Sequence, residues 1–101
     1  MIEQIINNIN YRLDEENLTA EVIKKSEGYE GDIIIPETVV FNTATYRVTS
    51  IRDGAFCGCK SLTNITFQGT VAQWKKINIR DSWNHNIPAT VVHCTDGNVE
   101  I

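Results

Sequence analysis

The sequence predicts a mostly β domain with one short helix, and three observations support this fold class. Apolar residues between Tyr46 and Phe67 recur at intervals of two, three or five positions, which is typical of a coiling repeat. Several short runs alternate apolar and polar residues and are bounded by turn residues, as the strands of β-hairpins are. One Thr-x-x-Gln pattern marks the start of a helix. At 101 residues, the chain is expected to form a single domain over residues 1–101.

Two β-hairpins are predicted in the N-terminal half of the chain. Apolar and polar residues alternate over Ile9–Leu13 and again over Leu18–Val22, with a four-residue loop between the two runs. A second pair of strands is expected at Val39–Phe41 and Tyr46–Val48, joined by a loop over Asn42–Thr45. Each hairpin can bury one apolar face against the rest of the domain.

A short strand is predicted between these hairpins. Gly31 and Pro36 bracket three consecutive isoleucines, Ile33–Ile35. Because proline has no N–H to donate, this strand must end at Pro36 or lie at the edge of a sheet. Residues 9–50 are therefore expected to form an N-terminal segment of hairpins that caps the domain.

The centre of the chain has the spacing of a leucine-rich repeat. Leu62, Ile65 and Phe67 form the L-x-x-I-x-F core of such a repeat, so all three are expected to be buried. A single repeat turn cannot bury its apolar face alone, and neighbouring turns or hairpins must cover it. We expect residues 51–80 to form one leucine-rich-repeat turn.

Two partial copies of the repeat follow. One repeats Val48-x-x-Ile51 as Val71-x-x-Trp74, 23 positions later. The other repeats Ile65-x-Phe67 as Val92-x-Cys94, 27 positions later. The longer spacing of the second copy predicts extra residues around Ser82–Pro88.

A helix of about two turns is predicted to start at Thr70. The Thr70 side chain would accept a hydrogen bond from an early helix amide, and Gln73 would return toward the Thr70 amide, which is a capping box. Trp74 and Ile77 would form the buried stripe of this helix. Trp74 and Trp83 are together expected to plug the ends of the core, since each indole can bury a large apolar surface.

Residues 81–101 are predicted to close the domain. Asp96-Gly97 lies between Val92–Cys94 and Val99–Ile101, which is a strong signal for a two-residue hairpin turn.

Several segments resemble the BspA-like leucine-rich-repeat proteins of bacteria. The segments are Y-x-G-D-I-x-I-P-x-x-V (Tyr29–Val39), Y-x-V-T-S-I (Tyr46–Ile51), A-F-x-x-C-x-S-L-T-x-I (Ala55–Ile65), G-T-x-x-x-W (Gly69–Trp74) and H-C-T-D-G (His93–Gly97). The resemblance covers nearly everything from residue 9 onward. It implies a short, truncated right-handed solenoid capped by β-hairpins, commonly displayed at the cell surface and used to hold other proteins. It implies no enzymatic activity and no cofactor.

The location of the protein is expected only from this resemblance, which indicates the cell surface or secretion. The first residues include the acidic Glu3 and have no basic segment, no apolar run of 7 to 15 residues and no small-residue cleavage site, so no signal peptide is predicted. No apolar run approaches ~18 residues, and membrane insertion is not expected.

The charge distribution argues against nucleic acid as the principal partner. Residues 1–50 have a net charge of −5 and residues 51–101 a net charge of +1, so no basic stripe is available to neutralise phosphates. Lys75, Lys76 and Arg80 lie close together in the sequence, but a solvated helix face explains them.

Neither a metal site nor a catalytic residue is predicted. Cys57, Cys59, His93 and Cys94 would supply four soft ligands, but the C-x-C spacing is unusual for zinc and adjacent strand residues point to opposite faces. Three cysteines leave one thiol unpaired in any intramolecular scheme, so no disulfide framework is indicated. No hydrolase, zinc-protease or phosphate-loop motif is present, and His85 is expected to be a surface residue.

The predicted binding face is the outward side of the repeat strands. Asn64, Thr66 and Gln68 alternate there with the expected core residues, and His93 would extend the same row. The sequence thus favours a non-enzymatic module that binds a protein partner. This module is expected to be a monomer or a weak homo-oligomer. Two alternatives stay open: a self-associating structural unit that forms by pairing of strand edges, and a glycan-binding module that uses Trp74 and Trp83.

Overall fold

The computed structural model describes residues 1–101 and contains ten strands in two sheets, with one short helix. The strands are β1 (Ile2–Ile6), β2 (Ile9–Asp14), β3 (Thr19–Val22), β4 (Gly31–Ile35), β5 (Thr38–Phe41), β6 (Ala44–Ile51), β7 (Leu62–Phe67), β8 (Asn78–Ile79), β9 (Val91–Cys94) and β10 (Gly97–Glu100), and the helix is α1 (Val71–Lys76). This confirms a mostly β fold with a single helix. The helix is neither long enough nor apolar enough to cross a membrane.

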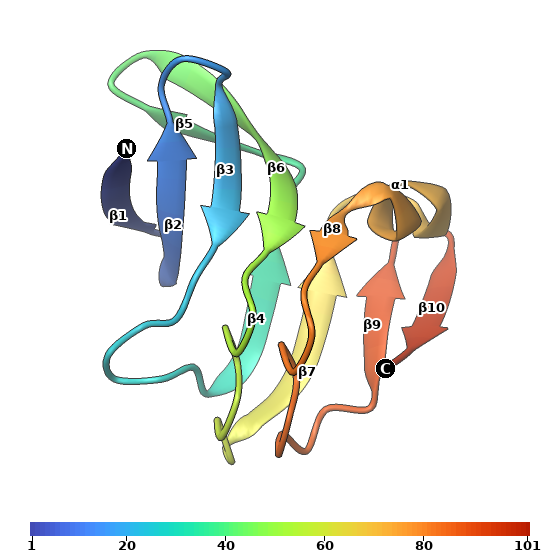
Figure 1. The fold of residues 1–101 in the computed structure, drawn as a ribbon. Coiled ribbons are helices and arrows are strands. Elements are labelled where there is room, and N and C mark those ends of the chain that lie inside the picture. The colour runs from blue at the N-terminus through green and yellow to red at the C-terminus, as the bar shows by residue number, and fades with distance from the viewer.

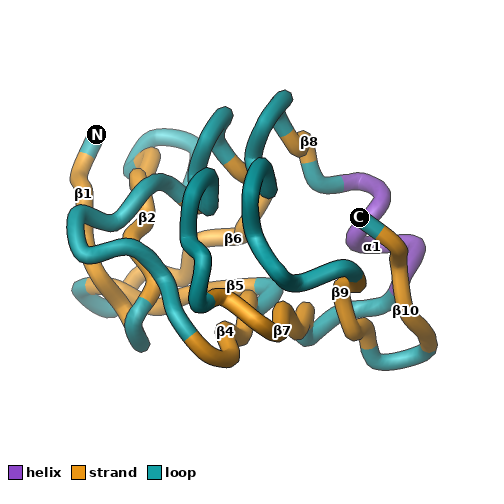
Figure 2. The backbone as a smooth tube through the Cα atoms, turned by 90° about the horizontal axis from the view of Figure 1, so that it is seen from below, coloured by secondary structure: helices purple, strands orange, loops and turns teal.

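The chain alternates between two parallel ladders of strands (Figure 1). β3, β6 and β8 pair in parallel in the first sheet, and β4, β7 and β9 pair in parallel in the second. Each passage from the first ladder to the second, from β3 to β4, β6 to β7 and β8 to β9, makes one coil, and the three coils lie in a row (Figure 2). The N-terminal segment, expected to supply hairpins, therefore also supplies strands β3 and β4 to both ladders.

The register of the second ladder stacks apolar residues in columns. Ile33 lies opposite Ile65, and Ile65 lies opposite Val92, so the predicted correspondence of Ile65 and Val92 is confirmed. All three belong to a cluster of 22 buried residues that lies between the ladders. Leu62 and Phe67 are buried in the same cluster, as the repeat spacing predicts.

The predicted copy of Val48-x-x-Ile51 at Val71-x-x-Trp74 is wrong. Ile51 pairs with Ile79, whereas Val71 and Trp74 belong to helix α1. The helix is inserted between β7 and β8, so the chain needs more residues to return to the first ladder than the 23-residue spacing allows.

The turns between the ladders also stack. The N–H of Phe56 donates to the carbonyl of Trp83 at 2.8 Å, and the N–H of Gly58 donates to the carbonyl of His85 at 2.8 Å. Ser82–Pro88, predicted to be extra residues, therefore includes the counterpart of the turn around Phe56 in the next coil. The 27-residue offset from Phe56 to Trp83 equals the offset from Ile65 to Val92.

Aromatic rings form a continuous row through the coils. The ring centroids of Tyr29 and Phe56 are 5.0 Å apart, and those of Phe56 and Trp83 are 5.7 Å apart. Trp83 lies 5.8 Å from Trp74, which lies 5.4 Å from Phe67. The expectation that the two tryptophans plug the ends of the core is wrong, because the indoles contact each other inside it.

The first predicted hairpin, β2 with β3, is confirmed, but a preceding strand was not predicted. β1 pairs with β2 through a two-residue turn, in which Asn7 and Asn8 have φ of 48° and 73°. Positive φ at both positions is characteristic of type I′ hairpin turns, for which asparagine is favoured. The Asn-Asn pair between Ile6 and Ile9 was the signal for this hairpin.

The second hairpin, β5 with β6, has a shorter turn than predicted. Asn42 and Thr43, with φ of 49° and 66°, form the turn, and Ala44 pairs with Phe41. The four-residue loop is thus a two-residue turn with both residues in the left-handed region. Threonine is uncommon in that region because its β-carbon is branched, so propensity alone does not indicate this turn.

The capping box of helix α1 is confirmed. Thr70 Oγ1 accepts from the N–H of Gln73 at 3.1 Å, and Gln73 Oε1 accepts from the N–H of Thr70 at 2.7 Å. Trp74 and Ile77 are buried, as predicted. A β-carbon on the preceding Gly69 would lie 2.6 Å from the Phe67 ring, so this close approach requires glycine.

The C-terminal hairpin of β9 and β10 is confirmed, with its turn at Thr95 and Asp96 instead of Asp96 and Gly97, since Gly97 pairs with Cys94. Asp96 Oδ1 accepts from the N–H of Val71 at 2.8 Å. This contact places a carboxylate at the first amide of α1 and ties the hairpin to the helix.

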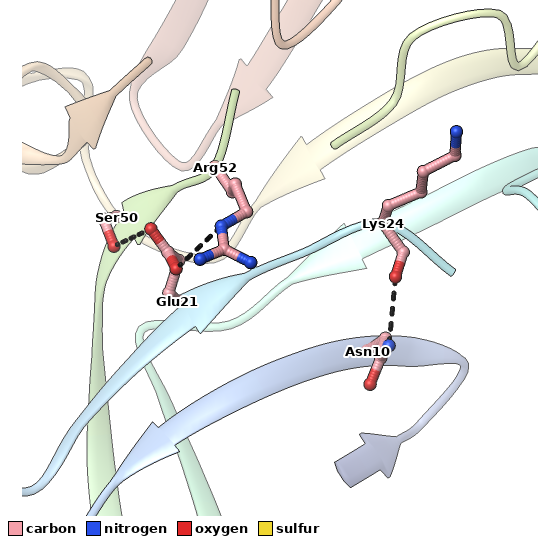
Figure 3. Close-up of polar contacts among 5 residues, drawn as sticks. All are labelled: Asn10, Glu21, Lys24, Ser50 and Arg52. Atoms are coloured by element: carbon pink, nitrogen blue, oxygen red, sulfur yellow. Dashed lines mark hydrogen bonds and ion pairs between the residues drawn. The ribbon is translucent and has the colours of Figure 1, made fainter. Parts of the chain in front are cut away.

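Polar contacts join β2, β3 and β6 beside the core (Figure 3). Glu21 accepts from Ser50 Oγ at 3.3 Å and lies 3.5 Å from Arg52 Nε. Asn10 Nδ2 donates to the carbonyl of Lys24 at 3.0 Å. Because the ion pair is partly exposed, its contribution to stability is at most about 1 kcal/mol.

Candidate binding surface

The predicted binding row starts on strand β7, whose alternation is as the sequence indicates. Ile65 and Phe67 point into the core, Asn64 is exposed and Thr66 is half-buried on the opposite face. The buried residues fix the orientation of the strand, because a slip by one residue would bring the polar side chains into the core.

The structure brings Thr66 and His93 together. They are partners in the parallel register of β7 and β9, and both side chains lie on the outer face of the second sheet. Nδ1 of His93 lies 3.1 Å from Oδ1 of Asn98 on β10. This contact orients the imidazole toward β10.

Two residues that the sequence analysis missed extend the row onto β4. Ile34 lies opposite Thr66, and Asp32 lies opposite Asn64. Asn64 Nδ2 donates to Asp32 Oδ1 at 2.8 Å. The alternation of Ile33 and Ile35 could have placed these side chains on the outer face, but their partners depend on a register between segments far apart in the sequence.

Gln68 lies at the border of this row. It follows β7, and its N–H donates to the carbonyl of Ile35 at 2.9 Å. Its side chain lines a hollow together with Ile34 and Pro36. The four predicted residues thus divide into a central group, Asn64, Thr66 and His93, and Gln68 at one end.

The row carries hydrogen-bond donors and acceptors, one carboxylate and one imidazole. These groups can recognise polar groups of a partner by hydrogen bonding. The half-exposed Ile34 adds an apolar contact beside Thr66. A surface with polar groups around a small apolar contact is typical of protein interfaces.

The four side chains considered as zinc ligands, Cys57, Cys59, His93 and Cys94, do not lie together in one site. Cys59 Sγ accepts from the N–H of Tyr29 at 3.3 Å, and Cys57 is exposed in the same turn. Cys94 packs against the core, where burial raises the pKa of its thiol, while His93 faces outward. No group of three or more side chains of the kinds that bind metals converges in the structure.

The tryptophans do not form an exposed platform for a sugar. Trp74 is 2% exposed and Trp83 is 8% exposed. A glycan-stacking surface needs an accessible ring face, so the structure gives no support to the glycan-binding alternative. The basic residues Lys75, Lys76 and Arg80 are exposed, as expected for a solvated face.

A bacterial protein of known structure is similar to this chain. It is a leucine-rich cell surface protein from Faecalibacterium prausnitzii A2-165, with a TM-score of 0.67 and 22% sequence identity over 95% of the chain. The chain shares the fold of a leucine-rich protein. It spans 24% of the length of that neighbour. No protein-family model and no curated protein matches the sequence.

Proposed function

We propose that the chain is a non-enzymatic, BspA-like leucine-rich-repeat module that binds a protein partner through the outer face of its second sheet. The binding residues in this proposal are Asn64, Thr66, Gln68 and His93, and residues 1–101 act as one unit. The observation that carries the proposal is the direct opposition of Thr66 and His93 across β7 and β9, beside the hydrogen-bonded pair of Asn64 and Asp32.

The three stacked coils support the proposal that the chain is a short solenoid. Successive coils that stack their apolar residues leave the outward residues in rows, and such rows are the surfaces that repeat proteins use for binding. The second sheet presents its row on a rigid base, because Ile65 and Val92 are fully buried behind Thr66 and His93. Rigid presentation reduces the entropy lost on binding.

In this proposal the protein lies at the cell surface and acts in adhesion. The supporting facts are the resemblance of several segments to BspA-like proteins and the fold shared with a leucine-rich cell surface protein. The fold alone does not identify the partner, since one scaffold can carry many specificities.

The test is affinity capture with a matched control. The immobilised chain is presented to extracellular protein fractions, bacterial and host, beside a triple variant with Asn64→Ala, Thr66→Ala and Gln68→Ala. The control variant carries Thr45→Ala, Arg47→Ala and Thr49→Ala, which alternate in the same way on β6 of the other sheet.

A partner of the proposed face is retained by the wild type and by the β6 control, and its dissociation constant rises about tenfold or more with the β7 variant. Equal retention by all three proteins, each with an unchanged unfolding temperature, would show that the β7 row is not the binding site.

A further inference from the structure

Strand β4 has an open edge, because it pairs only with β7 and ends the second sheet (Figure 2). The N–H of Gly31 donates to Ser61 at 2.7 Å, and the carbonyl of Ile35 accepts from Gln68 at 2.9 Å, both on the β7 side. In a parallel ladder alternate residues bond to the same neighbour. The N–H and carbonyl groups of Asp32 and Ile34 therefore point to the open edge.

A hollow of about 620 Å³ adjoins this edge. The turn between β1 and β2, Ile6–Ile9, and strand β5 from Thr38 to Val40 contribute to its lining, together with β4. Two of its apolar residues are exposed, Ile34 at 53% and Val40 at 62%. Of all the lining residues, only Asp32 is charged.

The part of this lining that comes from the β1–β2 turn is held in place. The buried ammonium of Lys25 donates to the carbonyl oxygen and to Oδ1 of Asn8 in that turn. A groove whose lining is fixed before binding loses less conformational entropy when a ligand enters.

We infer that an extended segment of a partner protein adds to the open edge of β4 as a strand. Its main chain would complete the hydrogen bonds of Asp32 and Ile34, as in other cases of strand addition. The side chains of these two residues lie on the same face, two positions apart. The added strand therefore carries a basic residue opposite Asp32 and an aliphatic residue two positions away, opposite Ile34.

The negative charge of the chain favours a basic segment of a partner protein at the β4 edge over a second copy of the chain. Residues 1–50, which contain most of the groove, have a net charge of −5, and the whole chain has a net charge of −4. Two copies that met at β4 would bring like charges together, whereas a basic segment is attracted. The strand edge shares Asp32, Ile34 and Gln68 with the border of the polar row, whereas Thr66 and His93 do not line the groove.

The first experiment measures the binding of labelled synthetic peptides by fluorescence anisotropy. The test peptide alternates Lys and Ile with Thr at the intervening positions, and two control peptides replace its Lys by Glu or its central residue by Pro. We expect the Lys peptide to bind at least about tenfold more tightly than either control. Equal affinity of the three peptides, or no binding, would overturn the inference.

Two variants locate the site. Asp32→Lys should reverse the preference from the Lys peptide to the Glu peptide, and Ile34→Lys should weaken binding of the Lys peptide about tenfold or more. Ile5→Lys is the matched control, because Ile5 is similarly exposed on β1 and does not line the groove. An equal loss with Ile5→Lys, or no change of preference with Asp32→Lys, would contradict the assignment.

Hydrogen exchange keeps the inference testable if a variant fails to fold. On the wild type, the Lys peptide should slow amide exchange at Asp32 and Ile34 and leave that at Ile33 and Ile35 unchanged. Binding without this pattern would exclude strand addition. Sedimentation of the free chain that shows a dimer, dissociated by Ile34→Lys, would instead make a second copy the occupant.

Thr66→Ala and His93→Ala should keep peptide binding, because these residues do not line the groove. Because Thr66 and His93 lie outside the groove, failure of the peptide experiment would leave their proposed role in partner binding intact, and failure of that role would leave the β4 groove intact.

Discussion

The ammonium of Lys25 is bound by Asn8: Nζ donates to the main-chain oxygen of Asn8 at 2.9 Å and to its side-chain oxygen at 2.5 Å. Lys25 is 6% exposed, and its Nζ lies 4.8 Å from the centroid of the Tyr29 ring. A buried charge is tolerated only where hydrogen bonds replace its hydration. Lys25 thus joins the β1–β2 turn to the segment that leads into β4.

Lys25→Met is expected to lower the free energy of unfolding by about 1.5 kcal/mol, since it removes hydrogen bonds to a charged donor but keeps the apolar stem. Urea unfolding measures this loss. Lys24→Met is the matched control, because Lys24 is exposed and its side chain extends away from Asn10 (Figure 3), and it should stay within about 0.5 kcal/mol of the wild type. Equal losses for the two variants would contradict a role of the ammonium.

Trp74 and Trp83 are expected to stabilise the fold jointly. Trp74→Leu and Trp83→Leu should each lower the free energy of unfolding, and a double-mutant cycle should give a coupling of about 0.5–1.5 kcal/mol. Denaturant unfolding of the four proteins provides the measurement.

A second cycle, of Trp74→Leu with Leu13→Ala on β2, controls for general effects of core substitution. β2 lies at the far end of the molecule from α1, so these two changes should be additive within about 0.5 kcal/mol (Figure 1). Additivity of the two tryptophan substitutions would show that their contact contributes nothing.

Elements with a strong local signal could be predicted from the sequence. The capping box at Thr70 and Gln73 needs only neighbouring residues, and the alternation of Asn64, Ile65 and Thr66 defines the two faces of β7 by itself. These signals depend on backbone hydrogen bonding and on side-chain direction, which are local properties.

The register between the strands of successive coils could not be predicted from a constant repeat length in the sequence. Ile33 and Ile65 are 32 residues apart, whereas Ile65 and Val92 are 27 residues apart, because different hairpins and turns separate the strands. The match of Trp83 to Phe56 depends on packing between the coils. The same long-range register decides that Asp32 and Ile34 join the row of Asn64 and Thr66, so these two residues were missed.

Thr70→Ala is expected to lower the free energy of unfolding by about 1 kcal/mol, because the N–H of Gln73 loses its acceptor. Thermal unfolding measures the effect. Thr70→Ser keeps the hydroxyl and should retain stability within about 0.5 kcal/mol. A Ser variant as unstable as the Ala variant would mean that the methyl group of Thr70, and not the cap, is what matters.

The buried hydroxyl of Tyr29 is expected to make the free energy of unfolding fall at alkaline pH. Its hydroxyl donates to the carbonyl of Ile23 at 2.7 Å and accepts from the N–H of Asn10 at 3.0 Å. Burial raises the pKa of Tyr29 from 10.0 to about 12, and burial also raises the pKa of Tyr11. Because the pKa is higher in the folded chain, the neutral phenol stabilises the fold fully below about pH 10, and this contribution is lost as the pH rises through about 12.

Urea unfolding between about pH 8 and pH 12, together with phenolate absorbance, measures this loss. Tyr29→Phe should be less stable than the wild type at neutral pH, since two hydrogen bonds are gone, but its stability should fall less steeply above about pH 10, because one raised phenol no longer titrates. Tyr11→Phe is the comparison for the other buried phenol. If the wild type and Tyr29→Phe lost stability in parallel over this range, the Tyr29 hydroxyl would not be the group that senses alkaline pH.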